Sequence, residues 1–297
     1  MNPVVPPPAT RGSRIRLVAP AGPIDPAAFE EGKRALTAHY EVVAGDVLLS
    51  RDGYHAGNDA LRLADLQAAL DDPLARAVVA ARGGYGTTRI LDRLDLRALA
   101  ANPKWIVGCS DVTALLVRVW TEIGLQSIHG PMAASLGRAH TDDARALFDL
   151  LEGHRPAAVR NLEPLCEGEV VGPMVGGNVT VLAHLVGSLP GSFARDAIVF
   201  LEDVNEAPYR LDRCLVQLLR AGALDGVAGF VLGGFEGCPP GPDGVTAMQA
   251  VMRNLEPLGV PVAGAYPAAH GERNLPWLHG ARVSLFAGAE AASLTTL

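Results

Sequence analysis

Short apolar segments alternate with amphipathic patterns through the first half of the chain, and this alternation constrains the possible folds more than any other feature. The apolar segments predict buried strands at residues 14–20, 77–81, 105–108 and 125–130. The patterns between them predict helices at residues 27–38, 59–71, 88–100 and 111–124. Strands that alternate with helices are typical of a parallel, doubly wound α/β sheet. Such sheets bind ligands beyond the carboxyl ends of their strands, so residues that directly follow a strand are the first candidates for a site.

The second half of the chain predicts a separate domain. With 297 residues, the chain is long enough for two domains. We expect an N-terminal α/β domain at residues 1–150, an irregular linker containing Pro and Gly at 151–172, and a C-terminal domain at 173–297. The C-terminal part combines apolar strand-like runs with a helix over residues 210–221 and a terminal β-hairpin over residues 281–297. We therefore expect a mixed α/β domain, although its strand order does not follow from the sequence.

Composition and charge argue against several classes of function. The net charge is -7 and no stripe of Lys and Arg occurs, so no nucleic-acid partner is expected. Apolar runs stop well short of the ~18 residues that cross a bilayer, and the proline-rich start lacks a signal-like apolar core. We expect a cytoplasmic protein without a membrane partner. The four cysteines form no C-x-x-C pair, which favours free thiols. Neither H-E-x-x-H nor G-x-x-x-x-G-K occurs, so neither a metal nor a cofactor is expected.

The segment "WIVGCSDVTALL", residues 105–116, places a cysteine and a serine at a strand-to-helix corner. Gly108 stands two positions before Ser110, as in the G-x-S-x-G nucleophile elbow, but Val112 replaces the second glycine. If Cys109 were the nucleophile, a valine would occupy the glycine position, so Ser110 is the better candidate. The alternative is that Ser110 caps the helix that follows. The corner alone leaves both interpretations open.

A second glycine-rich corner occurs in "ARGGYGTTR", residues 81–89. Gly83 and Gly84 directly follow a predicted strand, where backbone can approach a ligand closely and donate an N–H group to an oxyanion. The same residues would also suit a tight turn with no catalytic role.

A catalytic serine needs a general base, and the base needs a carboxylate that orients it. Two histidines follow the predicted strand at 260–266: His270, in a loop rich in Pro and Gly, is the first candidate, and His279 is its rival. Glu202 ends an apolar strand, where an unpaired charge would be costly, and is the first candidate for the acid. Asp203 and Glu206 are its close competitors. The other histidines offer weaker candidates: His55 and His129 could line a site, and His184 has the surroundings of a core residue.

Seven segments, taken together, resemble the LD-carboxypeptidase family of serine peptidases, which includes murein tetrapeptide carboxypeptidase and the microcin C immunity peptidase. They occur in the family's order and span nearly the whole chain: "RLVAPAGP", "ARGGYGTTRILDRLD", "IVGCSDVTALL", "HGPM", "VGGNVTVLAHLVGS", "FLEDVNEAPYRLDR" and "GAYPAAHGERNLPWLHG". The resemblance implies a nucleophile elbow in the first domain, with the acid and the base brought by the second domain across a cleft.

Carried over motif by motif, the resemblance implies a Ser110–Glu202–His270 triad. It also implies oxyanion donors at the backbone N–H groups of Gly84 and Asp111. Further candidates for contact with the substrate are Arg82, Gly83, Asn178 and Arg273, of which the two arginines could hold a terminal carboxylate.

The implied reaction needs neither metal nor cofactor. It removes the terminal D-alanine from a murein tetrapeptide, at its bond to the L-centre of meso-diaminopimelate, during cytoplasmic recycling of cell-wall peptides. The implied partners are this small peptide and, in a homodimer, a second copy of the chain.

Three alternatives remain at this point. An immunity-type peptidase would cleave an aminoacyl-nucleotide analogue, but the short chain shows no insertion that could carry an aromatic platform for a base. A non-catalytic protein could keep the scaffold to bind a small ligand. An amidotransferase-like enzyme would use Cys109, which the position of Gly108 disfavours.

Overall fold

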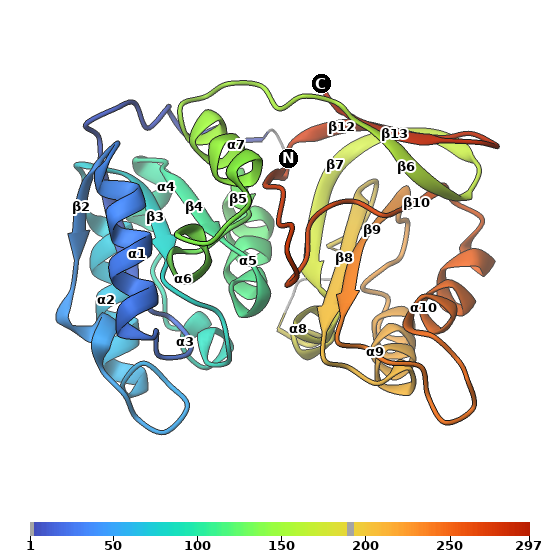
Figure 1. Cartoon of the computed structure of the whole chain (residues 1–297), viewed down its shortest axis with the longest axis horizontal. Helices are drawn as coiled ribbons and strands as arrows, with labels where there is room; N and C mark the ends of the chain where they lie inside the picture. The colour runs from blue at the N-terminus through green and yellow to red at the C-terminus, as the bar shows by residue number, and fades with distance from the viewer. Residues whose placement is uncertain (1–2, 189–192) are drawn as a thin grey trace. The chain divides into compact units, whose positions relative to one another are not determined.

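The computed structural model describes residues 3–188 and 193–297, which divide into two compact units. Unit 1 comprises Met1–Arg155 with Leu275–Leu278, and unit 2 comprises Pro156–Asn274 with His279–Leu297. Each unit contains its own sheet, and helices accompany both sheets (Figure 1).

Within the described residues, unit 1 is built on a six-stranded sheet with the order β11-β5-β4-β3-β1-β2. The strands β1 to β5 pair in parallel. The strands are β1 (Arg14–Val18), β2 (Glu41–Ala44), β3 (Ala75–Ala80), β4 (Trp105–Gly108), β5 (Ser127–His129) and β11 (Trp277–His279). The helices are α1 (Pro26–Thr37), α2 (Asp59–Asp71), α3 (Thr87–Leu91), α4 (Arg97–Ala101), α5 (Thr113–Ile123), α6 (Ala133–Leu136) and α7 (Thr141–Leu151), with short 3-10 helices η1 (Asp46–Leu49) and η2 (Ser110–Val112). The predicted parallel α/β sheet is confirmed.

The core of unit 1 follows from the two-residue period of the strands. Alternate strand residues such as Ile15, Leu17, Val79 and Val107 are fully buried in one cluster with apolar residues of α1, α6 and α7. Residues of the opposite parity, such as Val78, are buried too, and α2 and α5 contact the strands. Burial on both faces explains why β3 and β4 are almost continuously apolar in the sequence.

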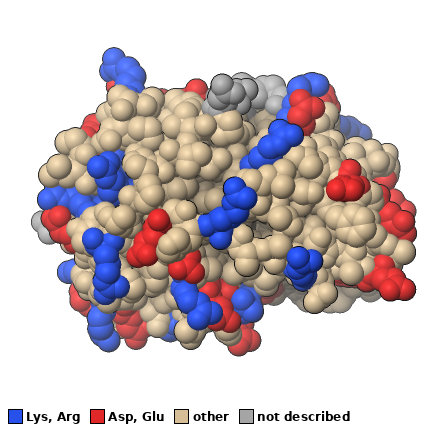
Figure 2. All heavy atoms as spheres, turned by 90° about the horizontal axis from the view of Figure 1, so that it is seen from above, with Lys and Arg blue, Asp and Glu red and all other residues tan. Residues whose placement is uncertain are grey.

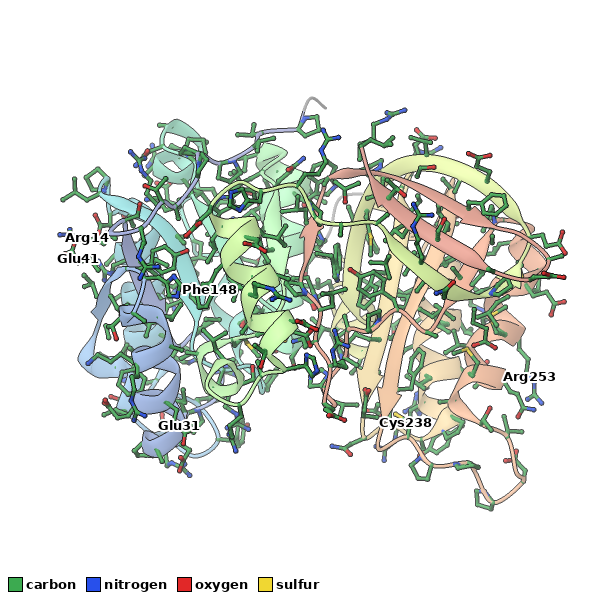
Figure 3. The ribbon with its side chains drawn as sticks, turned by 45° about the horizontal axis from the view of Figure 1, so that its top comes forward. Arg14, Glu31, Glu41, Phe148, Cys238 and Arg253 are labelled. Carbon is green, nitrogen blue, oxygen red and sulfur yellow. The ribbon has the colours of Figure 1, made fainter. Side chains whose placement is uncertain are left out.

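Two details of unit 1 differ from the sequence prediction. Residues 88–100 form two short helices, α3 and α4, because the Gln67 side chain bonds both backbone groups of Asp95, at 2.8 and 2.9 Å, and interrupts the helix. The strand β2 was not predicted. It lies beside β1, where Arg14 and Glu41 form a 2.8 Å ion pair whose two side chains lie side by side in Figure 3.

Within the described residues, the strands of unit 2 close into a barrel with the order β10-β6-β13-β12-β7-β8-β9. The strands β7 to β10 run in parallel, and the other pairs are antiparallel. The strands are β6 (Val159–Cys166), β7 (Gly168–Asn178), β8 (Ile198–Val204), β9 (Gly229–Glu236), β10 (Val262–Gly264), β12 (Arg282–Ala287) and β13 (Ala292–Thr296). The helices are α8 (Val179–His184), α9 (Pro208–Arg220) and α10 (Ala247–Leu255), followed by the 3-10 helix η3 (Glu256–Leu258). The predicted terminal hairpin is the antiparallel pair β12–β13.

The segment expected to be an irregular linker, residues 151–172, contains regular structure. Its larger part belongs to β6 and the start of β7. Most side chains of β6 are at least partly exposed, so the strand lacks the apolar alternation that would reveal it. Proline is rare inside a strand, but β6 accommodates Pro164 where its register with β10 shifts.

No helix among the described residues is long and apolar enough to cross a membrane. Lys, Arg, Asp and Glu side chains are interspersed on the face that Figure 2 shows, without a continuous stripe of one sign.

Candidate functional site

The Ser110 turn has the backbone geometry of a strained corner. The strand β4 ends at Gly108, and Ser110 opens η2, which leads into α5. Ser110 has φ 58°, in the left-handed region that non-glycine residues rarely adopt. A Cβ at position 108 would lie 2.6 Å from Cγ1 of Val112, so the turn closes only with glycine there. Val112, which breaks the sequence motif, therefore packs directly on Gly108.

The helix-capping interpretation of Ser110 does not fit this turn. An N-cap serine has extended backbone and accepts a hydrogen bond from the helix, whereas Ser110 is left-handed. The residues at the N-cap positions of η2 and α5 are Cys109 and Val112, and neither makes a side-chain cap. Strained backbone of this kind is typical of functional positions.

The glycine-rich loop after β3 lies against Ser110, as the sequence predicted for two corners at one edge of the sheet. A Cβ added at Gly83 would be 2.8 Å from Cβ and 3.0 Å from Oγ of Ser110. The carbonyl of Gly83 accepts a 3.0 Å hydrogen bond from the N–H of Gly22, and Gly84 has φ +113°. Only glycine allows this approach and this backbone conformation.

In unit 2, His270 and Glu202 form a hydrogen-bonded pair. Nδ1 of His270 lies 2.8 Å from Oε2 of Glu202. Glu202 lies in β8 and its side chain is 1% exposed, whereas the His270 side chain is 22% exposed. If Nδ1 donates to the carboxylate, Nε2 is the nitrogen that can accept a proton, which is the arrangement a general base requires.

The loop that carries His270 is held to the barrel by backbone contacts. The N–H of Gly234 donates to the carbonyl of Ala268 at 3.2 Å, and Ala268 forms an isolated antiparallel β-bridge with Asn274 across the loop. A Cβ at Gly233 would lie 2.3 Å from the same carbonyl. Glycine in β9 therefore lets the loop approach the strand and fixes the position of His270 relative to Glu202.

The pKa values of Glu202 and His270 are both raised, for different reasons. Burial raises the pKa of Glu202, and the hydrogen bond and charge of His270 only partly oppose this. Burial lowers the pKa of His270, but the hydrogen bond to Glu202 and the charges of Glu202, Asp203 and Glu236 outweigh it and raise that pKa overall. The pair therefore retains a proton to a higher pH than an isolated histidine does.

The competing carboxylates have other partners. Asp203 accepts hydrogen bonds from Nδ2 of Asn178 at 2.8 Å and from the N–H and Oγ1 of Thr180 at 2.9 and 2.8 Å. Oε2 of Glu206 lies 3.5 Å from Nη1 of Arg210, which belongs to the first turn of α9. Of the three acids that the sequence left open, Glu202 is the one that bonds His270.

The rival histidine has a structural role. His279 is fully buried, and its Nε2 accepts a 3.1 Å hydrogen bond from the N–H of Gly176. Burial lowers its pKa to about 3, so the ring is neutral at physiological pH. His184, expected in the core, is exposed, and its Nδ1 lies 2.7 Å from the carbonyl of Thr180.

The candidates for substrate contact fall into two groups. Asn178 is buried and caps α8, with Oδ1 accepting from the N–H of Val181 at 3.0 Å while Nδ2 bonds Asp203. The Asn178 side chain therefore positions Asp203 near the end of β8, and both its amide oxygen and its amide nitrogen bond groups of the protein. Arg82 is exposed and donates from Nη1 to the carbonyl of Pro23 at 2.8 Å, and Arg273 lies on the loop of His270.

Sequence reasoning missed the buried charges behind the glycine-rich loop. Arg62 is fully buried in α2, together with Leu66 and Leu70 on the same face. An arginine on the apolar stripe of an amphipathic helix is the signal that could have found it. The carboxylate of Asp111, next to Ser110, is also buried, whereas the resemblance implies a role only for its backbone N–H group.

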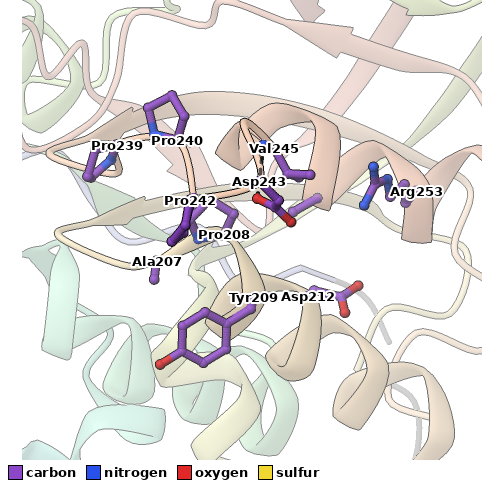
Figure 4. Close-up of a pocket in the computed structure, with 12 residues that line it drawn as sticks. Ala207, Pro208, Tyr209, Asp212, Pro239, Pro240, Pro242, Asp243, Val245 and Arg253 are labelled. Carbon is purple, nitrogen blue, oxygen red and sulfur yellow. Dashed lines mark hydrogen bonds between the residues drawn. The ribbon is translucent and has the colours of Figure 1, made fainter.

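A cavity of about 480 Å³ lies elsewhere in unit 2, between the start of α9 and the loop after β9 (Figure 4). Four prolines and Tyr209 contribute to its lining, which includes neither Glu202 nor His270. Among residues 3–188 and 193–297, no group of three or more His, Cys, Asp or Glu side chains is placed to hold a metal ion.

Comparison with known families identifies the chain. The model of the LD-carboxypeptidase N-terminal domain matches residues 15–130, and that of the LD-carboxypeptidase C-terminal domain matches residues 171–285. The chain belongs to the LD-carboxypeptidase family. Murein tetrapeptide carboxypeptidase of Pseudomonas aeruginosa is 33% identical over 285 residues, which cover 90% of this chain and 91% of the relative.

Solved structures agree with this assignment. Muramoyltetrapeptide carboxypeptidase from Oxalobacter formigenes is 28% identical, with a TM-score of 0.84 over 96% of this chain and 98% of that one. The microcin C7 self immunity protein reaches a TM-score of 0.88 over 99% of both chains at 20% identity, a likeness of fold. The chain is thus a carboxypeptidase of the LD-carboxypeptidase family with the mixed α/β architecture of these structures.

Proposed function

We propose that this LD-carboxypeptidase is a serine peptidase that releases the terminal D-alanine from murein tetrapeptide during cell-wall recycling. The His270–Glu202 pair is the observation that carries the proposal, because it supplies a base with its orienting carboxylate. The left-handed Ser110, against which Gly83 packs, supports the choice of nucleophile. The names of the murein relatives support the choice of substrate.

In the proposed mechanism, Ser110 is the nucleophile and His270 is the general base. Nε2 of His270 accepts the proton of the Ser110 hydroxyl as Oγ attacks the scissile carbonyl, and Glu202 stabilises the imidazolium. The backbone N–H groups of Gly84 and Asp111 stabilise the oxyanion. His270 then protonates the amine of the leaving D-alanine, and a water molecule, activated by the same histidine, hydrolyses the acyl-enzyme.

The free carboxylate of the substrate distinguishes an exopeptidase from an endopeptidase. Arg82 or Arg273 would bind this carboxylate, since a guanidinium forms strong charge-assisted hydrogen bonds. Loss of one charged hydrogen bond costs about 1.5–3 kcal/mol, so amidation of the terminal carboxylate should lower kcat/KM roughly 10- to 150-fold.

The experiment compares the tetrapeptide free acid with its C-terminal amide, with and without EDTA, and measures the released amino acid by chromatography. The proposal expects D-alanine from the free acid, slow cleavage of the amide and no effect of EDTA. Equal cleavage of both peptides, or loss of activity in EDTA, would contradict it. Arg82→Gln and Arg273→Gln, tested in parallel, would show which arginine is responsible, because the correct variant no longer distinguishes acid from amide.

The similarity to the microcin C7 self immunity protein favours one second candidate, a peptidase that cleaves aminoacyl-nucleotide analogues. Its test is cleavage of an aminoacyl sulfamoyl adenosine, which would have to exceed cleavage of the tetrapeptide to displace the first candidate. A protein that binds ligand without catalysis would leave a serine-reactive phosphonate unreacted.

We also propose a cytoplasmic homodimer, for which light scattering at assay concentration should give twice the mass of 31.0 kDa.

A further inference from the structure

The loop between β3 and α3 is rich in glycine, and the hydrogen bond from the N–H of Gly22 to the carbonyl of Gly83 holds only its first part. Its glycines at 83, 84 and 86 include two with strongly positive φ, +113° at Gly84 and +139° at Gly86. Glycine has many accessible backbone conformations, so fixing such a loop is entropically costly. A backbone N–H group in this loop can stabilise an oxyanion only if other contacts hold the loop in place.

One peptide group in this loop is bound from both sides by buried charged side chains. The N–H of Thr87 donates to Oδ2 of Asp111 at 2.8 Å. The carbonyl of Gly86, which belongs to the same peptide group, accepts from Nη1 of Arg62 at 2.8 Å. Asp111 is 3% exposed and Arg62 is 0% exposed, so water does not compete for either bond.

Arg62 is itself held in place. Its Nη1 also donates to the carbonyl of Pro20, and its Nη2 pairs with Asp59, which bonds Arg89 at 2.8 Å. The position of Arg62 is thus fixed by the carbonyl of Pro20, which follows β1, and by Asp59 of its own helix before it reaches Gly86. Asp111 is fixed by its place in the chain, directly after Ser110 in η2.

We propose that the Asp111 side chain is a positioning residue that fixes the glycine-rich loop relative to Ser110. This inference rests on the proposed function, in which Ser110 is the nucleophile and the N–H of Gly84 stabilises the oxyanion. The Asp111 carboxylate connects the residue after the nucleophile to the end of the loop. Arg62 holds the other side of the same peptide group. The side chain acts through the loop and touches no reacting atom.

The test compares Asp111→Asn and Asp111→Ala with the wild type, using murein tetrapeptide. The asparagine keeps one oxygen acceptor but loses the charge that strengthens the bond, and the alanine loses both. Loss of the oxyanion geometry should lower kcat about 10²-fold in Asp111→Ala and less in Asp111→Asn, with KM changed by less than about threefold.

Asp143 provides the matched control, because it is a buried carboxylate (1% exposed) in α7 of the same unit. Asp143→Asn and Asp143→Ala should lower the melting temperature and leave kcat of the folded enzyme unchanged. If the Asp111 variants also lose only stability and keep wild-type kcat, Asp111 has a purely structural role and the inference is wrong.

Hydrogen exchange of the peptide that covers residues 82–89 gives a second readout, and Asp111→Asn suffices for it if the alanine variant does not fold. The inference expects faster exchange in that peptide, with little change elsewhere in unit 1. Unchanged exchange together with a lower kcat would overturn it, because Asp111 would then act by another route. Failure of the proposed function is distinguishable, since Ser110→Ala would then be as active as the wild type.

Discussion

The contact between Gly83 and Ser110 allows the most direct structural prediction. In Gly83→Ala, the new Cβ would lie 2.8 Å from Cβ of Ser110, 3.0 Å from its Oγ and 3.5 Å from Cε of Met132. Carbon atoms normally approach to 3.5–4.0 Å, so the Ser110 contact is too short by roughly 0.7 Å. Gly83 does not have a positive φ in the left-handed region, so its backbone accepts alanine. The cost of the substitution therefore arises at the Ser110 turn.

Relief of this overlap must displace either Ser110 or the loop by several tenths of an ångström. Misplacement of a reacting group by about 1 Å costs up to about 10²-fold in rate, or about 2.7 kcal/mol of transition-state stabilisation. Overpacking of a close contact destabilises the fold by about 1–3 kcal/mol. We therefore expect Gly83→Ala to fold, with kcat/KM lowered between 10- and 100-fold, as an order-of-magnitude estimate.

The assay measures steady-state hydrolysis of the tetrapeptide and, separately, the rate at which a serine-reactive phosphonate modifies the enzyme. Gly12→Ala is the control, because Gly12 has φ +84° and no atom within 4 Å of the added Cβ. The control should lose about 1 kcal/mol of stability through backbone strain and keep its activity. If Gly83→Ala stays within twofold of the wild type in both assays, the contact between Gly83 and Ser110 does not determine the position of the nucleophile.

Two further predictions concern the His270–Glu202 pair. Glu202→Gln should lower kcat by about 10⁴, the cost of the analogous change in a serine protease triad, whereas Glu206→Gln should be much milder because Glu206 contacts Arg210. Equal losses in the two variants, measured with the tetrapeptide, would mean that Glu202 is not the triad acid. The pH dependence follows from the raised pKa of His270: kcat/KM should rise with pH as His270 loses its proton, with a midpoint above the ordinary value of about 6.5. In Glu202→Gln the midpoint should move to lower pH, since the remaining burial lowers the pKa; a midpoint unmoved in this variant would show that another group is titrating.

The first unit was more predictable from sequence than the second because its central strands β3, β4 and β5 are buried on both faces. Continuous apolar runs identified β1, β3, β4 and β5. In the second unit, β6 is largely exposed and contains Pro164, so its sequence resembles a linker. The barrel closes through β10, which pairs with β6 nearly a hundred residues earlier, and local patterns carry no signal of such a long-range contact.

The candidate site shows the same division between local and non-local information. The Ser110 corner was found because Gly108, the preceding strand and the helix that follows are neighbours in the sequence. The choice between Glu202 and Asp203 depends on which face of β8 each side chain occupies, and so on contacts with Asn178 and His270. The left-handed backbone of Ser110 likewise depends on packing, at the contacts of Gly83 with Ser110 and of Gly108 with Val112.

The identity of the nucleophile can be read from the site of covalent labelling. Trypsin cleavage after Lys104 and Arg118 releases one peptide, residues 105–118, which contains both Cys109 and Ser110. After reaction with a serine-reactive phosphonate, fragmentation of this peptide in a mass spectrometer distinguishes the two neighbouring side chains. We expect a single adduct on Ser110 that forms in Cys109→Ala, is abolished in Ser110→Ala and is strongly slowed in His270→Ala. An adduct on Cys109, or full tetrapeptide hydrolysis by Ser110→Ala, would contradict this expectation.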